Sequence, residues 1–352
     1  MKIAFFTYPS AFQNVGGGEI LLLKLREYLM REGVAVDLFD SWSAKVEQYD
    51  FIHVFGSVKD CLGLVKVANA RKVKVAITPL VWSDARRALF AEGSLRSKVD
   101  FIVRHYMKVL FPKFPSARRE LLLSADLLFP NSQVELTQTR DLFAVPESKM
   151  RVMPNGVDRS FLDADHLLFQ EKHGKEPFIL GVGRIEPRKN QLNLIRAVKK
   201  IPGKKLILIG SPVSGYENYF EQCRTDGADF TVFLPTISHG DALLKSAYAA
   251  CEVFVLQGWF ETPGLVAMEA ALAGARVAAT QGGSTREYFE NFVDYLDPAN
   301  VFSITESILK SIARPKTNDF KNHILSNYTW DKVAQKTISC YTEFLSKKTE
   351  PR

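Results

Sequence analysis

Short apolar runs alternate along the chain with longer segments of helical periodicity. The apolar runs fall into two groups of predicted strands. The first group is Ile3–Phe6, Val36–Phe39, Phe51–Phe55, Val73–Thr78 and Asp126–Phe129, and the second is Phe178–Val182, Leu206–Ile209, Thr231–Leu234, Val253–Leu256 and Arg276–Ala279. Strand–helix alternation of this kind predicts parallel sheets built from right-handed βαβ units. We therefore expect an α/β protein with two doubly wound, Rossmann-like sheets.

The most probable domain boundary lies just after the segment Met153–Asp158. This segment contains a proline and an Asn-Gly pair, and a polar stretch follows it at Glu171–Glu176. Such residues punctuate chains between folded elements. The length of 352 residues also exceeds what one hydrophobic core usually supports, so two domains are expected.

Composition narrows the class of protein. With 46% hydrophobic and 24% charged residues, the chain is typical of globular proteins and unlike disordered or fibrous ones. The four cysteines have no zinc-type or C-x-x-C spacing, so we expect a reducing cytosol, no disulfide scaffold and no metal site. The apolar run at Met1–Phe6 is too short for a signal peptide, and no run approaches a membrane span. A cytoplasmic protein, soluble or peripheral on the inner face of the membrane, is expected.

Positive charge is concentrated in one region. The whole chain carries +7, whereas Leu62–Glu120 alone has 13 Lys or Arg against 4 Asp or Glu, a charge of +9. Within it, Phe101–Phe114 interleaves Arg104, Lys108 and Lys113 with apolar and aromatic residues. This pattern indicates a surface for anionic lipid. An ordinary amphipathic helix with a buried stripe is an equal alternative, and no nucleic-acid motif supports binding of DNA or RNA.

The first strand leads into a glycine loop formed by Gly16, Gly17 and Gly18, which opens a helix. Free N–H groups at a helix start can hold a phosphate, and glycine lets the backbone approach it. A tight turn with no ligand is equally compatible. A nicotinamide site would need a different glycine spacing and an acidic residue at the second strand, for which Asp37 and Asp40 are candidates.

Two cations follow the first strand of the second group. Arg184 and Lys189 lie after Gly181 and Gly183, and Pro187 suits the first turn of a helix. Cations there oppose the helix dipole unless an anion binds between them and the N–H groups. We interpret Arg184 and Lys189 as ligands of a diphosphate, with a solvated basic turn as the alternative.

A second helix start carries two carboxylates. Thr262 is the predicted N-cap and Pro263 the first helical residue, so that the amides of Gly264, Leu265 and Val266 form a second phosphate cradle. Glu261 precedes this helix, and Glu269 lies two turns into an apolar run. An unpaired carboxylate is costly to bury, so we expect Glu269 to bind ligand hydroxyls, with a local pair as the alternative.

The histidines offer no catalytic signature. His53, His105 and His239 are isolated in the sequence, and none has a carboxylate partner at motif spacing, so a structural role is expected for each. A G-x-S-x-G nucleophile elbow is also missing from the sequence, which leaves acyl transfer without support.

Taken together, the motifs resemble the retaining glycosyltransferases of family 4, which have the GT-B fold. The resemblance spans nearly the whole chain, and its last two motifs below are highly specific in their order and separation. The motifs are Gly16–Glu19, Pro130–Ser132, Met153–Asp158, Gly183-Arg184 with Lys189-Asn190, and Glu261-x7-Glu269 with Gly264. Residues Tyr328–Val333 are similar to the start of the family's terminal helix.

The resemblance implies an architecture. Two Rossmann-like domains would face a central cleft, and the terminal helix would cross back to the first domain. The acceptor domain would comprise 1–158 plus 335–352, and the donor domain 159–334.

It also implies roles. Arg184 and Lys189 would bind the donor diphosphate beside Gly17 and Gly18, and Glu261 would position the sugar. Glu269 would hold the ribose hydroxyls, and Thr236 the base. Gly16 and Trp82 would lie on the acceptor side.

This sequence departs from the family at two places. Many relatives have a sugar-contacting histidine after the fourth strand, where Ala76–Trp82 has none, so that Trp82, Ser83 or Asp84 would substitute. The usual phenylalanine before Gly264 is Pro263.

The expected activity is transfer of a sugar from a UDP- or GDP-sugar to a hydroxyl of a glycan or lipid-linked glycan, without a cofactor or metal, in cell-surface polysaccharide or lipopolysaccharide synthesis. The alternatives are a non-catalytic nucleotide-sugar-binding protein and a nicotinamide oxidoreductase that uses the glycine loop.

Overall fold

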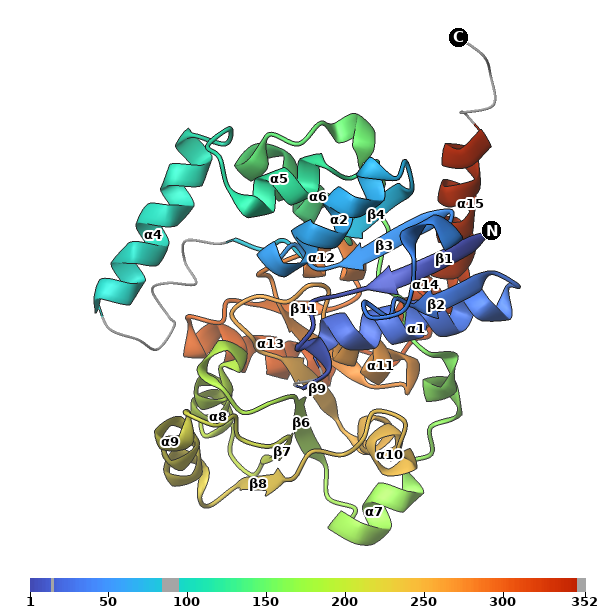
Figure 1. The fold of residues 1–352 in the computed structure, drawn as a ribbon. Coiled ribbons are helices and arrows are strands. Elements are labelled where there is room, and N and C mark those ends of the chain that lie inside the picture. The colour runs from blue at the N-terminus through green and yellow to red at the C-terminus, as the bar shows by residue number, and fades with distance from the viewer. Residues whose placement is uncertain (14–15, 84–94, 347–352) are drawn as a thin grey trace. The chain divides into compact units, whose positions relative to one another are not determined.

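The computed structural model describes residues 1–13, 16–83 and 95–346. The chain divides into two compact units. Of the described residues, the N-terminal unit comprises 1–13, 16–83, Val99–Gly156 and 328–346, and the C-terminal unit comprises 95–98 and Val157–Asn327. Each unit contains one parallel sheet with helices around it (Figure 1), as the strand–helix alternation predicts.

The N-terminal sheet has the strand order β2-β1-β3-β4-β5, all parallel. Its direction of winding reverses between β1 and β3, where open α/β sheets bind ligands. The strands are β1 (Lys2–Phe6), β2 (Ala35–Leu38), β3 (Phe51–Phe55), β4 (Lys74–Thr78) and β5 (Leu127–Leu128). The helices are α1 (Gly17–Arg31), α2 (Leu62–Ala70), α4 (Leu95–Leu110), α5 (Ala117–Leu123), α6 (Gln133–Phe143) and α15 (Trp330–Ser346).

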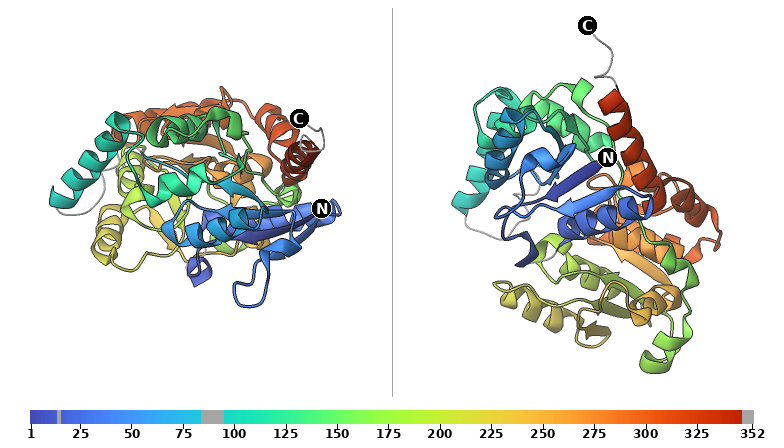
Figure 2. Two further views of the ribbon diagram at one scale, coloured as in Figure 1. Left: turned by 45° about the horizontal axis from the view of Figure 1, so that its top comes forward. Right: turned by 45° about the vertical axis from the view of Figure 1, so that its right-hand side comes forward.

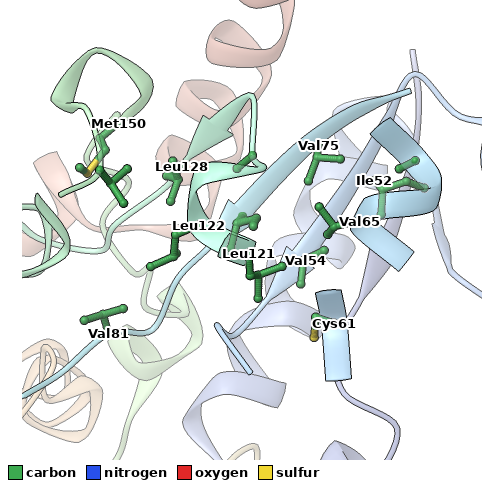
Figure 3. Packing of buried hydrophobic residues seen from close by; sticks show 14 of the residues in the cluster. Ile52, Val54, Cys61, Val65, Val75, Val81, Leu121, Leu122, Leu128 and Met150 are labelled. Carbon is green, nitrogen blue, oxygen red and sulfur yellow. The ribbon is translucent and has the colours of Figure 1, made fainter. Parts of the chain in front are cut away.

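The core of this unit lies on both faces of its sheet. On one face, β3 and β4 pack against α2 and α5 through aliphatic residues such as Val54, Val65 and Leu121 (Figure 3). The other face is covered by α1 and α15, which contact each other. The central strands β1, β3 and β4 are therefore buried on both sides, as expected of a doubly covered parallel sheet.

The chain returns to the N-terminal unit at Tyr328, after its earlier passage through that unit ends at Gly156. Trp330, the first residue of α15, packs beside Gly156. A Cβ at Gly156 would lie 2.5 Å from Trp330 Cδ2, and the Trp330 ring packs against Tyr28 of α1. The indole thus anchors the helix at its first residue.

The C-terminal sheet has the strand order β11-β10-β9-β6-β7-β8, again parallel. Its winding reverses between β6 and β9. The strands are β6 (Phe178–Val182), β7 (Lys205–Ile209), β8 (Thr231–Leu234), β9 (Val253–Leu256), β10 (Arg276–Thr280) and β11 (Asp294–Leu296). The helices are α7 (Leu167–His173), α8 (Gln191–Val198), α9 (Glu217–Gly227), α10 (Ala242–Ala250), α11 (Leu265–Leu272), α12 (Thr285–Phe289), α13 (Val301–Ala313) and α14 (Asp319–Asn327).

One helix of the N-terminal unit differs from the rest. Residues 98–110 of α4 are all exposed or half-buried, and in Figures 1 and 2 the helix stands away from the strands of its own unit. The alternative in which its apolar stripe is core is therefore wrong. In the part of the chain that the structure describes, neither α4 nor any other helix is both long and apolar enough to cross a membrane.

Candidate functional site

The candidate site of the C-terminal unit lies where the winding of its sheet reverses. Strands β6 and β9 are neighbours there, so the loops that leave their carboxyl ends run side by side. The loop after β6 carries Arg184 and Lys189, and the loop after β9 carries Glu261. The fold thus brings together residues that are more than 70 positions apart in the sequence.

Lys189 and Glu261 form an ion pair across these two loops. Lys189 Nζ donates to Glu261 Oε1 at 2.7 Å, and the side chains are 18% and 9% exposed. Gly258 makes room for the pair, because a Cβ there would lie 2.6 Å from Glu261 Oε1. An ammonium group has three donors, so Lys189 can hold Glu261 and still donate to an incoming anion.

Backbone hydrogen bonds hold the two loops to each other. Trp259 donates from its backbone N–H to the Arg188 carbonyl at 3.1 Å and from its indole N–H to the Pro187 carbonyl at 3.0 Å. Glu261 is fixed from its other side, since its N–H donates to Gly282 and its carbonyl accepts from Ser284. These hydrogen bonds therefore fix the backbone of the two loops that carry Lys189 and Glu261.

Arg184 is the more open cation of this site. Its side chain is 54% exposed and reaches Glu186 at 3.5 Å, while Arg188 reaches the same carboxylate at 3.1 Å and lies over the Phe260 ring. Arg188 is therefore more enclosed than Arg184. An anion that approaches the β6 loop therefore meets Arg184 more readily than Arg188.

The turn that carries Lys189 differs from the prediction. Residues Pro187–Lys189 form a 3-10 turn, and α8 begins only at Gln191. Asn190 interrupts the helix because its side-chain amide donates to the Gln257 and Pro298 carbonyls, which holds its backbone in the left-handed region. Lys189 thus lies just before a helix start and not in its first turn.

The start of α11 is also later than predicted. Gly264, at φ 93°, is the N-cap, whereas Thr262 and Pro263 precede the helix. Glu261 is held extended by its bridge to Gly283, so the chain cannot turn into a helix until Gly264. The predicted cradle remains in part: Leu265 and Val266 are the first helical residues, whose N–H groups have no carbonyl partner within an α-helix.

Glu269 is buried in α11 and has two side-chain partners. His239 Nε2 lies 2.6 Å from Oε1, and the Tyr248 hydroxyl donates to Oε2 at 3.2 Å. Burial, and then the charge of Glu269, raise the pKa of Tyr248 well above its ordinary value. His239 thus has a carboxylate partner, although not at motif spacing. The partner is 30 residues away in the sequence, and no spacing rule could have revealed the pair.

Thr236 joins two neighbouring strand ends. Its hydroxyl donates to the Ser211 hydroxyl at 2.9 Å and accepts from the Ser211 N–H at 3.0 Å. Ser211 follows β7 and Thr236 follows β8, so both lie at the carboxyl edge of the sheet. Sequence reasoning singled out Thr236 but missed Ser211.

In the N-terminal unit, the glycine loop opens α1 with Gly16 as its N-cap. The carboxylate of Glu19 accepts from the Gly16 N–H at 2.8 Å and from the Tyr8 hydroxyl at 3.2 Å. Burial, followed by the charge and the hydrogen bond of Glu19, raises the pKa of Tyr8. A Cβ at Gly18 would lie 3.2 Å from Leu80 Cδ1, so close packing is one reason for glycine there. Gly17 is the first helical residue.

The segment after β4 is held by α6. Glu135, which is buried, accepts from the Val81 and Asn131 N–H groups, both at 2.6 Å. Burial raises the pKa of Glu135 to about 7 against these two hydrogen bonds. Trp82 is half-buried, and Ser83 contacts His105 of α4 at 2.8 Å. Asp84, the third proposed substitute for the missing histidine, lies outside the described residues.

The basic residues of α4 and the turn after it lie at the surface. Arg104 pairs with Asp100 one turn earlier, and Lys113 is exposed. Lys108 lies over the Phe143 ring, and burial together with the charges of Arg118 and Arg104 lowers its pKa. Over the described ranges, we find no group of three or more His, Cys, Asp or Glu side chains that could hold a metal ion.

The C-terminal unit matches a known protein family. Residues 165–324 match the model of the glycosyl transferases group 1. An uncharacterized glycosyltransferase of Methanocaldococcus jannaschii is 29% identical over 220 residues, which cover 57% of this chain and 55% of that protein. A D-inositol 3-phosphate glycosyltransferase of Stackebrandtia nassauensis is 31% identical over 185 residues, which cover 47% of this chain and 41% of that protein. The matches span about half the length of these curated relatives.

Solved structures are similar over nearly the whole chain. Sucrose-phosphate synthase from Thermosynechococcus elongatus has a TM-score of 0.77 at 18% identity, covering 99% of this chain and 100% of that one. The Anabaena protein HepE in complex with UDP has a TM-score of 0.72 at 18% identity, covering 97% and 100%. These likenesses show the fold. The fold is the predicted GT-B fold. The match over residues 165–324 relates the C-terminal unit to the group 1 glycosyl transferases, in agreement with the resemblance to family 4.

Proposed function

We propose that this chain is a retaining, metal-independent glycosyltransferase that moves a hexose-type sugar from a nucleotide diphosphate to a hydroxyl of a glycan or lipid-linked glycan. The observation that carries the proposal is the Lys189–Glu261 pair at the point where the sheet reverses its winding, with the open cation Arg184 beside it. In this proposal the C-terminal unit holds the donor, and the N-terminal unit holds the acceptor.

Each group then has a defined role. Departure of the diphosphate develops negative charge on its oxygens, and preorganised cations stabilise such charge most effectively. Lys189 and Arg184 supply those cations, together with the N–H groups at the start of α11. Glu261, which accepts from Lys189, orients the sugar, as the family resemblance implies, and is not the nucleophile. The acceptor hydroxyl attacks from the face that the diphosphate leaves, and a phosphate oxygen takes its proton.

Relatives support the choice of donor and pathway. The Anabaena protein HepE has been solved with UDP and with UDP-glucose. A lipopolysaccharide outer core galactosyltransferase, WaaB, shares the fold with a TM-score of 0.67 at 13% identity, covering 97% of this chain and 100% of that one. We therefore propose a UDP- or GDP-sugar as donor and a role in cell-surface polysaccharide or lipopolysaccharide synthesis.

The test is the turnover of Lys189→Ala beside a matched control. Removal of one preorganised donor costs about a hundredfold or more in turnover. Lys204→Ala breaks a similar pair, Lys204 Nζ to Glu252 Oε2 at 2.6 Å, which is part-buried and lies at the amino ends of β7 and β9. We expect Lys204→Ala to keep its turnover.

Sugar release and transfer from UDP-, GDP-, ADP- and dTDP-sugars are the measurements, after a thermal-shift screen selects the donor. Near-normal turnover of Lys189→Ala would overturn the assignment. Donor binding by the wild type with no turnover on any acceptor would instead favour the non-catalytic nucleotide-sugar-binding protein.

We also propose that α4 contacts anionic lipid, which would bring the acceptor to a membrane surface. The large apolar side chains along α4 and the turn after it are exposed, and basic residues lie among them. The exposed apolar residues are Val99, Val103, Tyr106, Met107, Val109, Leu110, Phe111 and Phe114. Burial of such a face in a lipid headgroup layer, combined with attraction of its cations, is the physics of peripheral binding.

Vesicle sedimentation tests this contact. Binding to vesicles of phosphatidylglycerol and phosphatidylcholine is expected to weaken with salt and to fall in the triple variant Arg104→Gln, Lys108→Gln, Lys113→Gln. A triple variant of exposed lysines in the C-terminal unit, Lys172→Gln, Lys199→Gln, Lys200→Gln, changes the net charge equally and should bind as the wild type does. Equal binding by both variants would contradict the α4 contact.

A further inference from the structure

The buried carboxylate of Glu269 is held by a part-exposed histidine. Glu269 is 3% exposed and lies among apolar residues of α11, where an unpaired charge is costly. One of its two hydrogen-bonding partners, Tyr248, is fully buried. The other, His239, has a side chain that is 37% exposed. Glu269 is therefore bonded from within by Tyr248 and from the accessible side by His239.

The position of His239 is fixed by its neighbours. Its ring packs edge-on against Phe161, with ring centroids 5.5 Å apart, and Phe161 is fully buried and also contacts Tyr248. The backbone turns tightly there, since the Asp241 N–H donates to Ser238 and the Asp241 carboxylate caps α10. The contact between His239 and Glu269 is thus built into the turn before α10 and is supported by an aromatic wall.

In this geometry the protein uses part of the capacity of the Glu269 carboxylate to accept hydrogen bonds, and the rest is left for a ligand. A carboxylate only accepts hydrogen bonds, so His239 Nε2 and the Tyr248 hydroxyl are the donors. Each carboxylate oxygen can accept about two hydrogen bonds, and each of these two oxygens already accepts one from the protein. The plane of the carboxylate is then set, and the remaining places can take two hydroxyl groups of one ligand. A ribose 2′,3′-diol has that chemistry.

We propose that His239 is a positioning residue for ribose recognition: it sets the Glu269 carboxylate so that it discriminates a ribose diol from its deoxy forms. The proposal rests on the proposed donor site and adds a residue to it. His239 and Thr236 lie three positions apart in the loop after β8, so one loop would contribute to holding both the base and the ribose.

Binding of UDP, 2′-deoxy-UDP and 3′-deoxy-UDP tests the inference by calorimetry, with GDP and ADP and their deoxy forms in parallel. A hydrogen bond to a charged group corresponds to about a tenfold change in affinity. We expect His239→Ala to weaken UDP about tenfold and the deoxy forms about threefold or less. His239→Gln, which retains a donor near the Nε2 position, should restore most of the preference for UDP.

Two further variants separate positioning from structure. His239→Phe keeps the ring contact with Phe161 and removes the donor, so it should lose the ribose preference even if His239→Ala is unstable. His173→Ala removes a histidine ring that packs on Phe169 in the same unit, and it should leave the preference unchanged.

Equal weakening of UDP and of its deoxy forms by His239→Ala and His239→Phe, or no weakening, would overturn the inference while the donor site stands. A wild-type protein that binds none of UDP, GDP and ADP would overturn the donor site itself and the inference with it.

Discussion

Each unit has a hydrogen-bonded cluster that contains a histidine and a buried tyrosine, and the two clusters have different surroundings. In the N-terminal unit, His53 of β3 is fully buried and contacts the Tyr341 hydroxyl of α15 and the Thr78 hydroxyl of β4. In the C-terminal unit, His239 and Tyr248 both contact Glu269, and His239 is part-exposed. One arrangement is closed by neutral groups, while the other surrounds a carboxylate and remains accessible.

The difference separates a structural polar cluster from a binding one. Both ring nitrogens of His53 are satisfied by hydroxyl groups, and burial lowers its pKa to about 3, so the ring is neutral at physiological pH. It joins α15 to the sheet and leaves nothing for a ligand. At Glu269, acceptor capacity remains beyond the two donors. The expected structural role of His53 is thus confirmed, whereas His239 lies at the candidate donor site.

The largest expected difference between the two clusters is in stability. His53→Ala leaves the Tyr341 and Thr78 hydroxyl groups buried without a partner and opens a cavity, which should cost about 3 kcal/mol of unfolding free energy. His239→Ala should cost about 1 kcal/mol because water can reach the vacated place. Urea unfolding of both variants measures this difference. Equal losses of unfolding free energy in the two variants would contradict the distinction between a structural and a binding cluster.

Acid should act on the His53 cluster next most strongly. Unfolded histidine has a pKa of about 6.5, and folded His53 has one of about 3. Between these values the unfolded state binds a proton that the folded state does not. The contribution is therefore complete above about pH 6.5 and falls by about 1.4 kcal/mol per pH unit below it, so that about 2 kcal/mol has been lost at about pH 5.

Glu135 acts in the opposite direction, because burial raises its pKa to about 7 and its contribution therefore decreases as pH rises toward that value. Glu135 is present in both the wild type and His53→Gln, so its effect cancels when the unfolding free energy of one is subtracted from that of the other at each pH. A difference that does not change with pH would contradict the neutral, buried state of His53.

Sequence periodicity was sufficient for ten of the strands in the two sheets but missed the short edge strand β11. The family resemblance placed Lys189 and Glu261 at one site, and the structure pairs them at the carboxyl ends of β6 and β9. The helix starts nearby were not predictable, because distant carbonyls decide them. Asn190 leaves the helical region for partners at Gln257 and Pro298, and Gly282–Ser284 hold Glu261 extended.

Side-chain pairing and exposure were harder to predict. His239 and Glu269 meet because the β8–α10 loop lies beside α11, which no local spacing encodes. The amphipathic pattern of α4 was equally compatible with a buried stripe and with an exposed one, since periodicity reports which face is apolar and not what covers it. Tertiary contacts alone decide between these outcomes.

Removal of the tyrosine hydroxyl group from each cluster is expected to have smaller effects that also distinguish the two clusters. Tyr341→Phe leaves His53 Nδ1 buried without a partner and should cost about 1.5 kcal/mol of stability while nucleotide affinity is unchanged. Tyr248→Phe should cost about 1 kcal/mol and also weaken nucleotide binding about threefold, because Glu269 loses its inner donor. Thermal melting and calorimetric titration with UDP report the two effects. Loss of UDP binding in Tyr341→Phe alone would reverse the assigned roles.

The smallest effect is expected at Thr236, whose hydrogen bonds with Ser211 are exposed. Thr236→Ala should change stability by no more than about 0.5 kcal/mol, since exposed contacts contribute little. Its proposed role is at the nucleotide base, so the ranking of UDP, GDP and ADP affinities should change by about threefold. Ser211→Ala removes the partner hydroxyl and should change the ranking in the same direction, because each residue orients the other. An altered ranking in Ser211→Ala with an unaltered one in Thr236→Ala would assign the base contact to the β7 loop instead.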